Sequence, residues 1–322
     1  DQGYTTSFVM RVYVASPGES VNGGGVPLSQ TNWAVSIAEV QVPSSGNATV
    51  MWSAVSGIEY DIYKSTDAFG SGMNWSKVTS SHEASSSMED TMVSVSGSRS
   101  FLQVVPEGAS PTLHGVWGVI KPLVVPGGGI TLVSPPLETD LDFQGDLGDQ
   151  MADSVSAGAK VMIMTPGVSP TWTELTLNGS GEWIKTSGSG GYTLEPGQAF
   201  FLQTAGAETS LSIAGEVGND LTKQNTLSVG YNLIGISEGK NLPASTAFES
   251  ASPVGHANND ETLADQVVVQ RPDGSWRRLI RRSNGTWYDT ENPNATSNTS
   301  LQLTPGQAYY YIRRNSTTTL TF

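Results

Sequence analysis

The sequence contains no cysteine, only three histidines, and few charged residues, which make up 14% of its 322 residues. Without cysteine the chain has no disulfide, no thiolate nucleophile and no cysteine-ligated metal. His82, His114 and His256 lie far apart and form no metal-binding motif. No stretch approaches the roughly 20 consecutive apolar residues that a membrane span needs, so we expect no membrane insertion.

Basic residues are also scarce. The formal net charge is −14 and the isoelectric point is close to 4.5. Nucleic-acid binding relies on a basic footprint that neutralises phosphates, so this balance argues against nucleic acid as a partner.

Turn-forming residues are abundant, with 36 glycines and 17 prolines. No segment shows a 3.6-residue apolar period of helical length, whereas many short runs alternate or are rich in β-branched and aromatic residues. The composition therefore predicts an all-β protein.

One short motif occurs twice. Pro-Gly-Gln-Ala stands at 196–199 and again at 305–308, and residues 194–213 align without a gap on residues 303–322. Three further blocks match in the same order upstream: 172–183 with 276–287, 151–155 with 263–267, and 130–136 with 231–237. Four matched blocks indicate a tandem repeat of a whole domain rather than of a solenoid unit.

Each block has a simple local interpretation. Pro-Gly favours a type II turn, because proline presets φ and glycine accepts φ above zero. The large side chains after each motif predict a strand, on which Tyr309 and Tyr311 face opposite to Tyr310. The segments 172–183 and 276–287 predict hairpins with Asn-Gly in their turns.

The N-terminal third has a different pattern, with paired strand signals and a tryptophan near a hairpin. The residues of this pattern are Val50, Trp52, Val55, Gly57, Tyr60, Ile62, Tyr63, Ser65, Thr66, Asp67, Trp75, Phe101 and Val104. Over roughly residues 35 to 106 the chain therefore resembles the fibronectin type III-like sandwich modules of large exported bacterial proteins.

The repeated domain is similar to another β module of exported bacterial surface proteins, which has a Gly-x-Asn-Leu opening strand and a Leu-x-Pro-Gly closing strand. The matching residues are Gly230, Asn232, Leu233, Pro305, Gly306 and Tyr309, while Thr131 replaces the asparagine in the first copy. Both resemblances imply extracellular β architecture, and neither implies catalysis.

These patterns together predict an all-β chain of three consecutive antiparallel β-sandwich or barrel-like domains, the last two a tandem repeat. We expect an N-terminal strand plus a fibronectin III-like sandwich over 1–115, here the first domain. The two copies follow over 116–217, the second unit, and 218–322, the third unit. Gly- and Pro-containing polar stretches mark both boundaries.

Export is expected from the start of the chain. It begins at Asp1 without a methionine or a basic segment, which we interpret as a mature form after signal-peptide removal. Seven Asn-X-Ser/Thr sequons are weak candidates for glycosylation: Asn47, Asn74, Asn178, Asn284, Asn294, Asn298 and Asn315.

No motif predicts an enzyme or a cofactor. The sequence lacks a Gly-x-Ser-x-Gly elbow, and nothing singles out a catalytic carboxylate pair among the 30 acidic residues. The acidic run Glu138, Asp140, Asp142, Asp146, Asp149 and Asp153 is a calcium candidate without the EF-hand spacing, so a solvated acidic loop is the preferred interpretation.

Aromatic residues leave two interpretations open. Trp172, Trp183, Trp276 and Trp287 occur at matching positions in both copies, as expected of a core that each copy builds for itself. The alternative is a platform on which sugars stack, in an adhesin or carbohydrate-binding protein.

Charge is unevenly spread along the chain. The formal net charges are −6 for residues 1–115, −8 for residues 116–217 and 0 for residues 218–322, which sum to −14. The arginines that crowd residues 218–322, beside two acidic parts, suggest head-to-tail steering of one copy of the chain onto another, with an ordinary solvated hairpin as the alternative. The candidate residues are Arg277, Arg278, Arg281, Arg282, Asp140, Asp142 and Asp146.

The N-terminal segment suggests a second mode of self-association. Phe8, Met10, Val12 and Val14 share one face of a predicted strand that resembles residues 119–128. Such a strand can add to the sheet edge of a neighbouring copy or pair within its own domain. We therefore predict a structural subunit of an extracellular bacterial assembly (a filament, a pilus-like fibre or a surface layer) with a cell-surface adhesin as the alternative.

Overall fold

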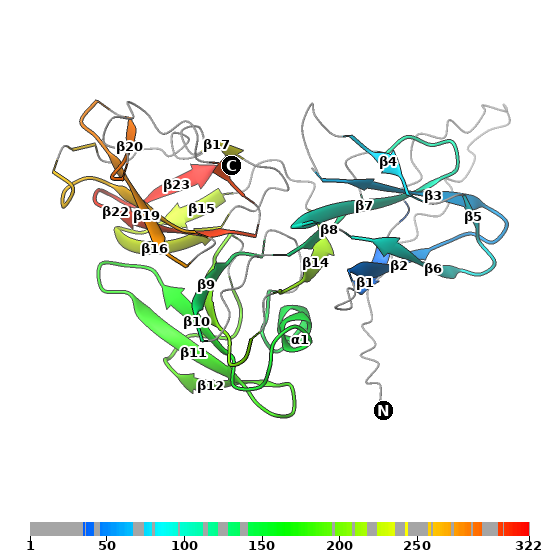
Figure 1. Cartoon of the computed structure of the whole chain (residues 1–322), viewed down its shortest axis with the longest axis horizontal. Coiled ribbons are helices and arrows are strands. Elements are labelled where there is room, and N and C mark those ends of the chain that lie inside the picture. The colour runs from blue at the N-terminus through cyan, green and yellow to red at the C-terminus, as the bar shows by residue number, and fades with distance from the viewer. Residues whose placement is uncertain are drawn as a thin grey trace, which may run out of the picture.

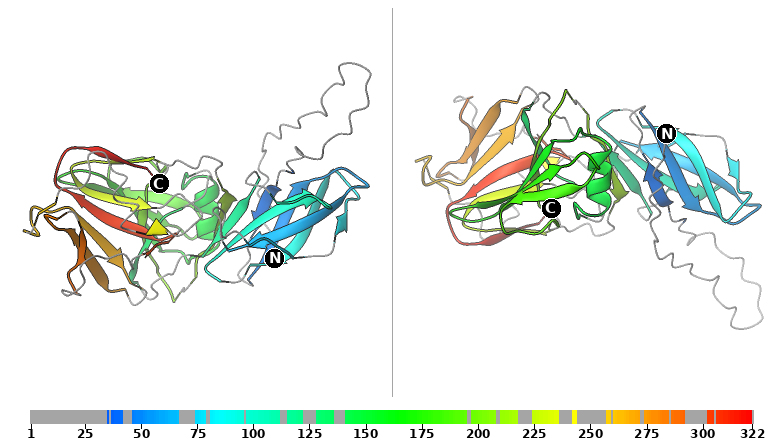
Figure 2. Two further views of the ribbon diagram at one scale, coloured as in Figure 1. Left: turned by 90° about the horizontal axis from the view of Figure 1, so that it is seen from above. Right: turned by 90° about the horizontal axis from the view of Figure 1, so that it is seen from below.

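The computed structural model describes residues 35–321 with gaps, the longest of which are 42–45, 67–73, 122–127, 136–140, 218–223, 236–241, 244–256 and 292–301. The described part is almost entirely strand and turn, in several antiparallel sheets, which confirms the predicted all-β class. The first domain occupies one end of the long axis, and two strands of the third unit, β19 (Trp276–Arg281) and β20 (Trp287–Asp289), lie at the other (Figure 1 and Figure 2).

The first domain is a sandwich of two sheets. One sheet has the order β1-β2-β6, and the other has the order β14-β8-β7-β3-β4, with β5 also paired to β3. The strands are β1 (Ile37–Gln41), β2 (Asn47–Ser53), β3 (Glu59–Ser65), β4 (Ser76–Lys77), β5 (His82–Glu83), β6 (Met88–Ser94), β7 (Arg99–Pro106), β8 (Trp117–Ile120) and β14 (Ile213–Glu216). Alternation along β2 turns Ala48, Val50 and Trp52 into the core.

Two strands of this sandwich come from the second unit. β8 pairs with β7, from Arg99 opposite Ile120 to Leu102 opposite Trp117, and β14 pairs with the other edge of β8. Val119 and Ala214 belong to the same buried cluster as Trp52. The sheet and its core therefore continue across the boundary expected at residues 115 and 116.

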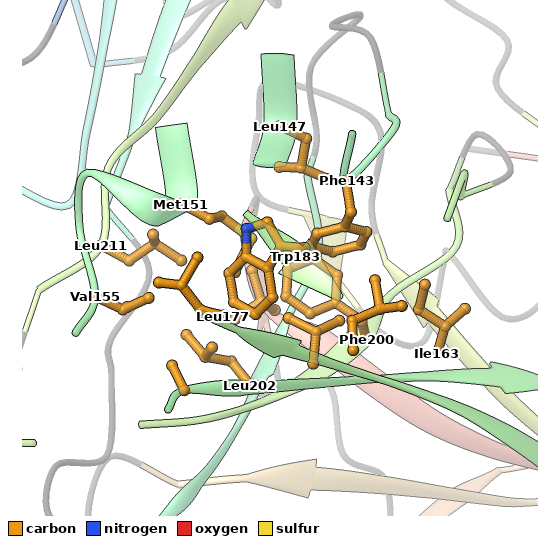
Figure 3. Packing of buried hydrophobic residues seen from close by; sticks show 14 of the residues in the cluster. Phe143, Leu147, Met151, Val155, Ile163, Leu177, Trp183, Phe200, Leu202 and Leu211 are labelled. Carbon is orange, nitrogen blue, oxygen red and sulfur yellow. The ribbon is translucent and has the colours of Figure 1, made fainter. Parts of the chain in front are cut away.

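The second unit adds a five-stranded sheet of order β12-β11-β10-β13-β9 and a short helix. Its elements are β9 (Ile130–Val133), α1 (Asp146–Ala152), β10 (Lys160–Thr165), β11 (Thr171–Leu177), β12 (Trp183–Ser187) and β13 (Phe200–Gln203). Trp183 lies at the centre of the core beside Phe143, Leu147 and Met151 (Figure 3), and its indole Nε1 donates to the carbonyl of Gly148 at 3.0 Å.

The third unit has a five-stranded sheet of order β16-β22-β18-β19-β20, plus the pairs β15-β23 and β17-β21. Its strands are β15 (Gln224–Leu227), β16 (Gly230–Gly235), β17 (Leu242–Pro243), β18 (Gln266–Gln270), β19 (Trp276–Arg281), β20 (Trp287–Asp289), β21 (Gln302–Leu303), β22 (Ala308–Arg313) and β23 (Thr318–Thr321). The strands that match in sequence hold the same places in both five-stranded sheets.

Candidate functional site

The predicted inter-subunit strand and part of the predicted acidic set lie outside the described residues. This applies to Phe8, Met10, Val12, Val14 and Asp140. Their predicted roles stay predictions.

The arginines proposed for contacts between chains are engaged inside the third unit. Arg277 donates from Nε and Nη2 to Oδ2 of Asp289, at 2.9 and 2.6 Å. Arg278 donates to Oε2 of Glu261 at 2.6 Å, on an exposed part of the surface. The Arg277 guanidinium holds the pKa of the Asp289 carboxyl below its usual range, against the effect of burial.

The other two arginines are also occupied. Arg281 is buried, and the guanidinium of Arg282 lies 3.4 Å from the ring centroid of Tyr288, a cation–π contact. On the second unit, Asp142 accepts from the backbone N–H of Gln144 and from Oγ1 of Thr193, while Asp146 begins α1. Arg277, Arg278 and Arg282 are therefore held by contacts within the third unit, and Arg281 is buried there.

The glycosylation candidates divide by exposure. Asn47, Asn74, Asn284 and Asn315 are exposed. Asn178 is half-buried, and its side chain closes the β11–β12 turn through Ser180 and Glu182. Asn294 and Asn298 lie outside the described residues.

The acidic run predicted as a calcium candidate is described only in part. Asp142, Asp146, Asp149 and Asp153 are described, and Glu138 lies with Asp140 outside the described part. Within the described residues, no group of three or more His, Asp or Glu side chains is arranged to hold a metal ion. No helix of the described part is long and apolar enough to cross a membrane.

The repeated tryptophans do not share one environment. Trp183 and Trp287 are each 3% exposed in the cores of their units, as the core interpretation expects. Trp172 is half-buried and packs on Phe201, with ring centroids 5.3 Å apart. Trp276 is 44% exposed.

The two Pro-Gly-Gln-Ala segments lie at the contact between the second and third units. Gln198 forms a β-bridge with Ile234, and Gln307 forms one with Val133. The backbone N–H of Gly235 donates to the carbonyl of Gly197 at 2.9 Å. The matching N–H, that of Ser134, donates to the carbonyl of Gly306 at 3.2 Å. Each repeated segment thus pairs with the opening strand of the other unit.

The repeated glutamines have equivalent roles. Nε2 of Gln198 donates to the carbonyl of Met164, and Nε2 of Gln307 donates to that of Gln270, at 2.9 and 3.0 Å. Met164 is the last residue but one of β10, and Gln270 is the last residue of the matching strand β18. Each side chain therefore fixes its Pro-Gly-Gln-Ala segment to its own sheet, while the backbone pairs with the neighbouring unit.

An apolar cluster fills the space between the two sheets. It comprises Leu132, Met164, Ala199, Leu233 and Ala308. Four half-buried rings pack against this cluster: Trp172, Phe201, Tyr231 and Tyr310. Burial raises the pKa of the Tyr310 phenol above its ordinary value.

Each side of the contact is closed by a further link. On one side, Gly167 and Tyr231 exchange two backbone hydrogen bonds, at 3.0 and 2.8 Å. On the other side, the Gln270 side chain accepts from the N–H of Leu132 at 2.9 Å and donates to the carbonyl of Ile130. The two five-stranded sheets are therefore joined through a nearly two-fold arrangement of equivalent residues.

Sequence reasoning assigned each of the two segments to the closing turn and strand of its own unit. It missed the contact that each segment makes with the opening strand of the other unit. One available signal was the outward face of each strand, where Phe201 and Tyr310 follow a small alanine at Ala199 and Ala308. An apolar face next to a small residue is typical of a surface that another sheet covers.

No protein-family model matches the chain, and no curated protein is significantly similar to it.

Proposed function

We propose that the protein is a structural subunit of an extracellular assembly such as a filament, a pilus-like fibre or a surface layer. The observation that carries the proposal is the way in which the three parts are joined. Both junctions consist of backbone hydrogen bonds between strands together with buried apolar side chains.

The first junction is a shared sheet. β7 and β8 pair over four residues, and the N–H of Lys121 extends the pairing to the carbonyl of Ser98 at 2.7 Å. Phe101, Ile120 and Val217 are buried together beneath this pairing. A shared sheet resists bending far better than a flexible Gly- and Pro-rich linker.

The second junction is the contact between the repeats. Two bridges, the matched backbone bonds from Gly235 to Gly197 and from Ser134 to Gly306, and the five-residue apolar cluster hold one sheet on the other. A chain whose parts are fixed at both junctions suits a role in which copies transmit force or keep a constant spacing.

Copies of the chain are proposed to join through the N-terminal segment. Its predicted strand places Phe8, Met10, Val12 and Val14 on one face, the pattern used for addition to a sheet edge. The arginines of the third unit are satisfied within that unit, so charge is assigned only a long-range steering role.

Electron microscopy of the purified protein over a concentration series tests the proposal. We expect polymers that grow longer with concentration and that disappear when residues 1–15 are deleted, while the remaining chain stays folded. Val12→Asp should abolish polymers, and Tyr13→Asp, on the opposite face of the predicted strand, is the matched control. A protein that remains monomeric at every concentration contradicts the proposal.

A second candidate is a carbohydrate-binding protein, favoured by one observation. Trp276 is 44% exposed at the start of β19, and an exposed indole can stack on a sugar ring. Binding to a glycan array that is lost in Trp276→Ala, without loss of fold, supports this candidate. Absence of binding on the array argues against it.

A further inference from the structure

Ser134 and Gly235 occupy matching positions in the two repeats and meet each other at the centre of the contact. Ser134 directly follows β9, and Gly235 ends β16. A Cβ atom built on Gly235 would lie 1.4 Å from Oγ and 2.2 Å from Cβ of Ser134. Real Cβ atoms essentially never approach other atoms within 3.0 Å. The contact therefore has room for one side chain at this point.

The backbone on both sides prevents the two residues from moving apart. The N–H of Ser134 is bonded to Gly306, and that of Gly235 is bonded to Gly197. A shift large enough to admit a second side chain would break one of these bonds and open the apolar cluster beside it. Close-packed interiors relax little around added atoms.

The Ser134 hydroxyl is not needed for a hydrogen bond. The residue is completely buried, and its Oγ has no hydrogen-bond partner among the described residues. An unsatisfied buried hydroxyl lowers stability, so its value at this position is the volume that it fills.

We propose that the two faces carrying the Pro-Gly-Gln-Ala segments, one on the second unit and one on the third, form a matched docking pair, and that Ser134 and Gly235 determine its specificity. One second unit pairs with one third unit because Ser134 and Gly235, which meet at the centre of the contact, together supply a single side chain. Two second units would bring two serines into a space for one. Two third units would bring two glycines and leave a void, which costs packing.

The partner that fits the face of the second unit in trans is the third unit of a second copy of the chain. A contact built from equivalent residues on both sides is the kind that domain swapping exchanges between copies. This inference concerns the contact between units and does not depend on how copies polymerise through the N-terminal segment.

The experiment uses the full chain with a protease site inserted between residues 218 and 223, cleaved after folding. We expect residues 1–217 and 218–322 to stay associated without a covalent link, as measured by size-exclusion chromatography over a dilution series. Gly235→Ala should weaken this association about tenfold to a hundredfold, since overpacking a close contact carries a cost of that size.

Two further variants make the result decisive. Ser134→Gly combined with Gly235→Ala restores a single side chain and should restore association to within a few fold of the parent protein. Gly179→Ala, at a turn where an added Cβ meets nothing within 4 Å, is the matched control and should have no effect.

Circular dichroism of each uncleaved variant shows whether it folds. Gly235→Ala fragments that stay fully associated overturn the inference. A double variant that associates no better than Gly235→Ala also overturns it, including when Gly235→Ala alone fails to fold.

Discussion

At the scale of single residues, Glu89 closes the loop before β6. Its Oε2 lies 2.9 Å from Nε2 of His82, and its Oε1 accepts from the backbone N–H groups of Ser85 and Ser86. The hydrogen bond with His82, followed by that with Ser86, lowers the pKa of Glu89 from 4.5 to about 2. One carboxylate thus holds the loop and the edge of the Trp52 core together.

This lowered pKa predicts a loss of stability in acid. The unfolded chain binds the proton at a higher pH than the folded chain does, so the contribution of Glu89 is complete above about pH 4.5. It is lost as the pH falls through about 2. The melting temperature of the wild type should therefore fall more steeply over this range than that of Glu89→Gln. Parallel curves for the two proteins would refute the assignment.

The third unit contains a completely buried ion pair. Nη1 of Arg313 donates to Oδ2 of Asp265 at 2.9 Å, and both side chains are 0% exposed. The same carboxylate accepts from the Tyr311 hydroxyl and from the backbone N–H of Arg314. The gap-free alignment of 194–213 on 303–322 places Leu202 and Thr204 at the positions of Tyr311 and Arg313. The strand register, in which Val161 faces Leu202 as Val267 faces Tyr311, places Ala159 at the position of Asp265. The charged network is therefore specific to the third unit.

Arg313→Met should lower the free energy of unfolding by about 3–5 kcal/mol, because it leaves a buried carboxylate without its partner. Arg278→Met removes an exposed pair with Glu261 and should cost at most about 1 kcal/mol. Urea denaturation of both variants measures the difference. Equal and small effects would show that the buried pair does not stabilise the unit.

At the scale of elements, local signals predicted the strands and turns of both repeats. Gly197 and Gly306 have φ of 76° and 85°, as the predicted Pro-Gly turns require. Tyr309 and Tyr311 are buried while Tyr310 is half-exposed, as the alternation predicted. Turn conformations depend on the sterics of neighbouring residues, and strand faces depend on a two-residue period. Both effects act within a few residues, so the turns and the buried faces of strands can be inferred from the sequence.

Other elements could not be predicted from local patterns. Helix α1 is seven residues long, too short for an apolar period to be recognised. It is held by tertiary bonds: Trp183 donates to Gly148, and the Gln150 side chain bonds both polar groups of Ala214 on β14. In the sequence alignment, Met151 near the end of α1 matches Leu263 of the third unit. Leu263 lies in a turn and is 52% exposed.

At the scale of the whole molecule, the first domain and the second unit share a sheet and should therefore share stability. Ile120 is 1% exposed and belongs to β8, yet it packs on Phe101 of β7. A substitution in the second unit therefore reaches the core of the first domain.

Ile120→Ala should destabilise this shared region by about 2–5 kcal/mol. Hydrogen exchange should accelerate at the amides of β7, although the substitution lies beyond the predicted boundary. Leu279→Ala, equally buried in the core of the third unit, is the control and should leave β7 protected. Unchanged exchange in β7 of Ile120→Ala would mean that the two parts unfold independently.

The sequence by itself determined the all-β class, the turns and the inward-facing residues, because these depend on side-chain period and on local sterics. Only the tertiary structure decided that β8 and β14 complete the sheet of the first domain, that the third-unit arginines are satisfied internally, and that the two Pro-Gly-Gln-Ala segments pair with opposite repeats. These contacts join residues that are between 12 and 174 positions apart in the chain, and no local pattern encodes which exposed edge or face will find which partner.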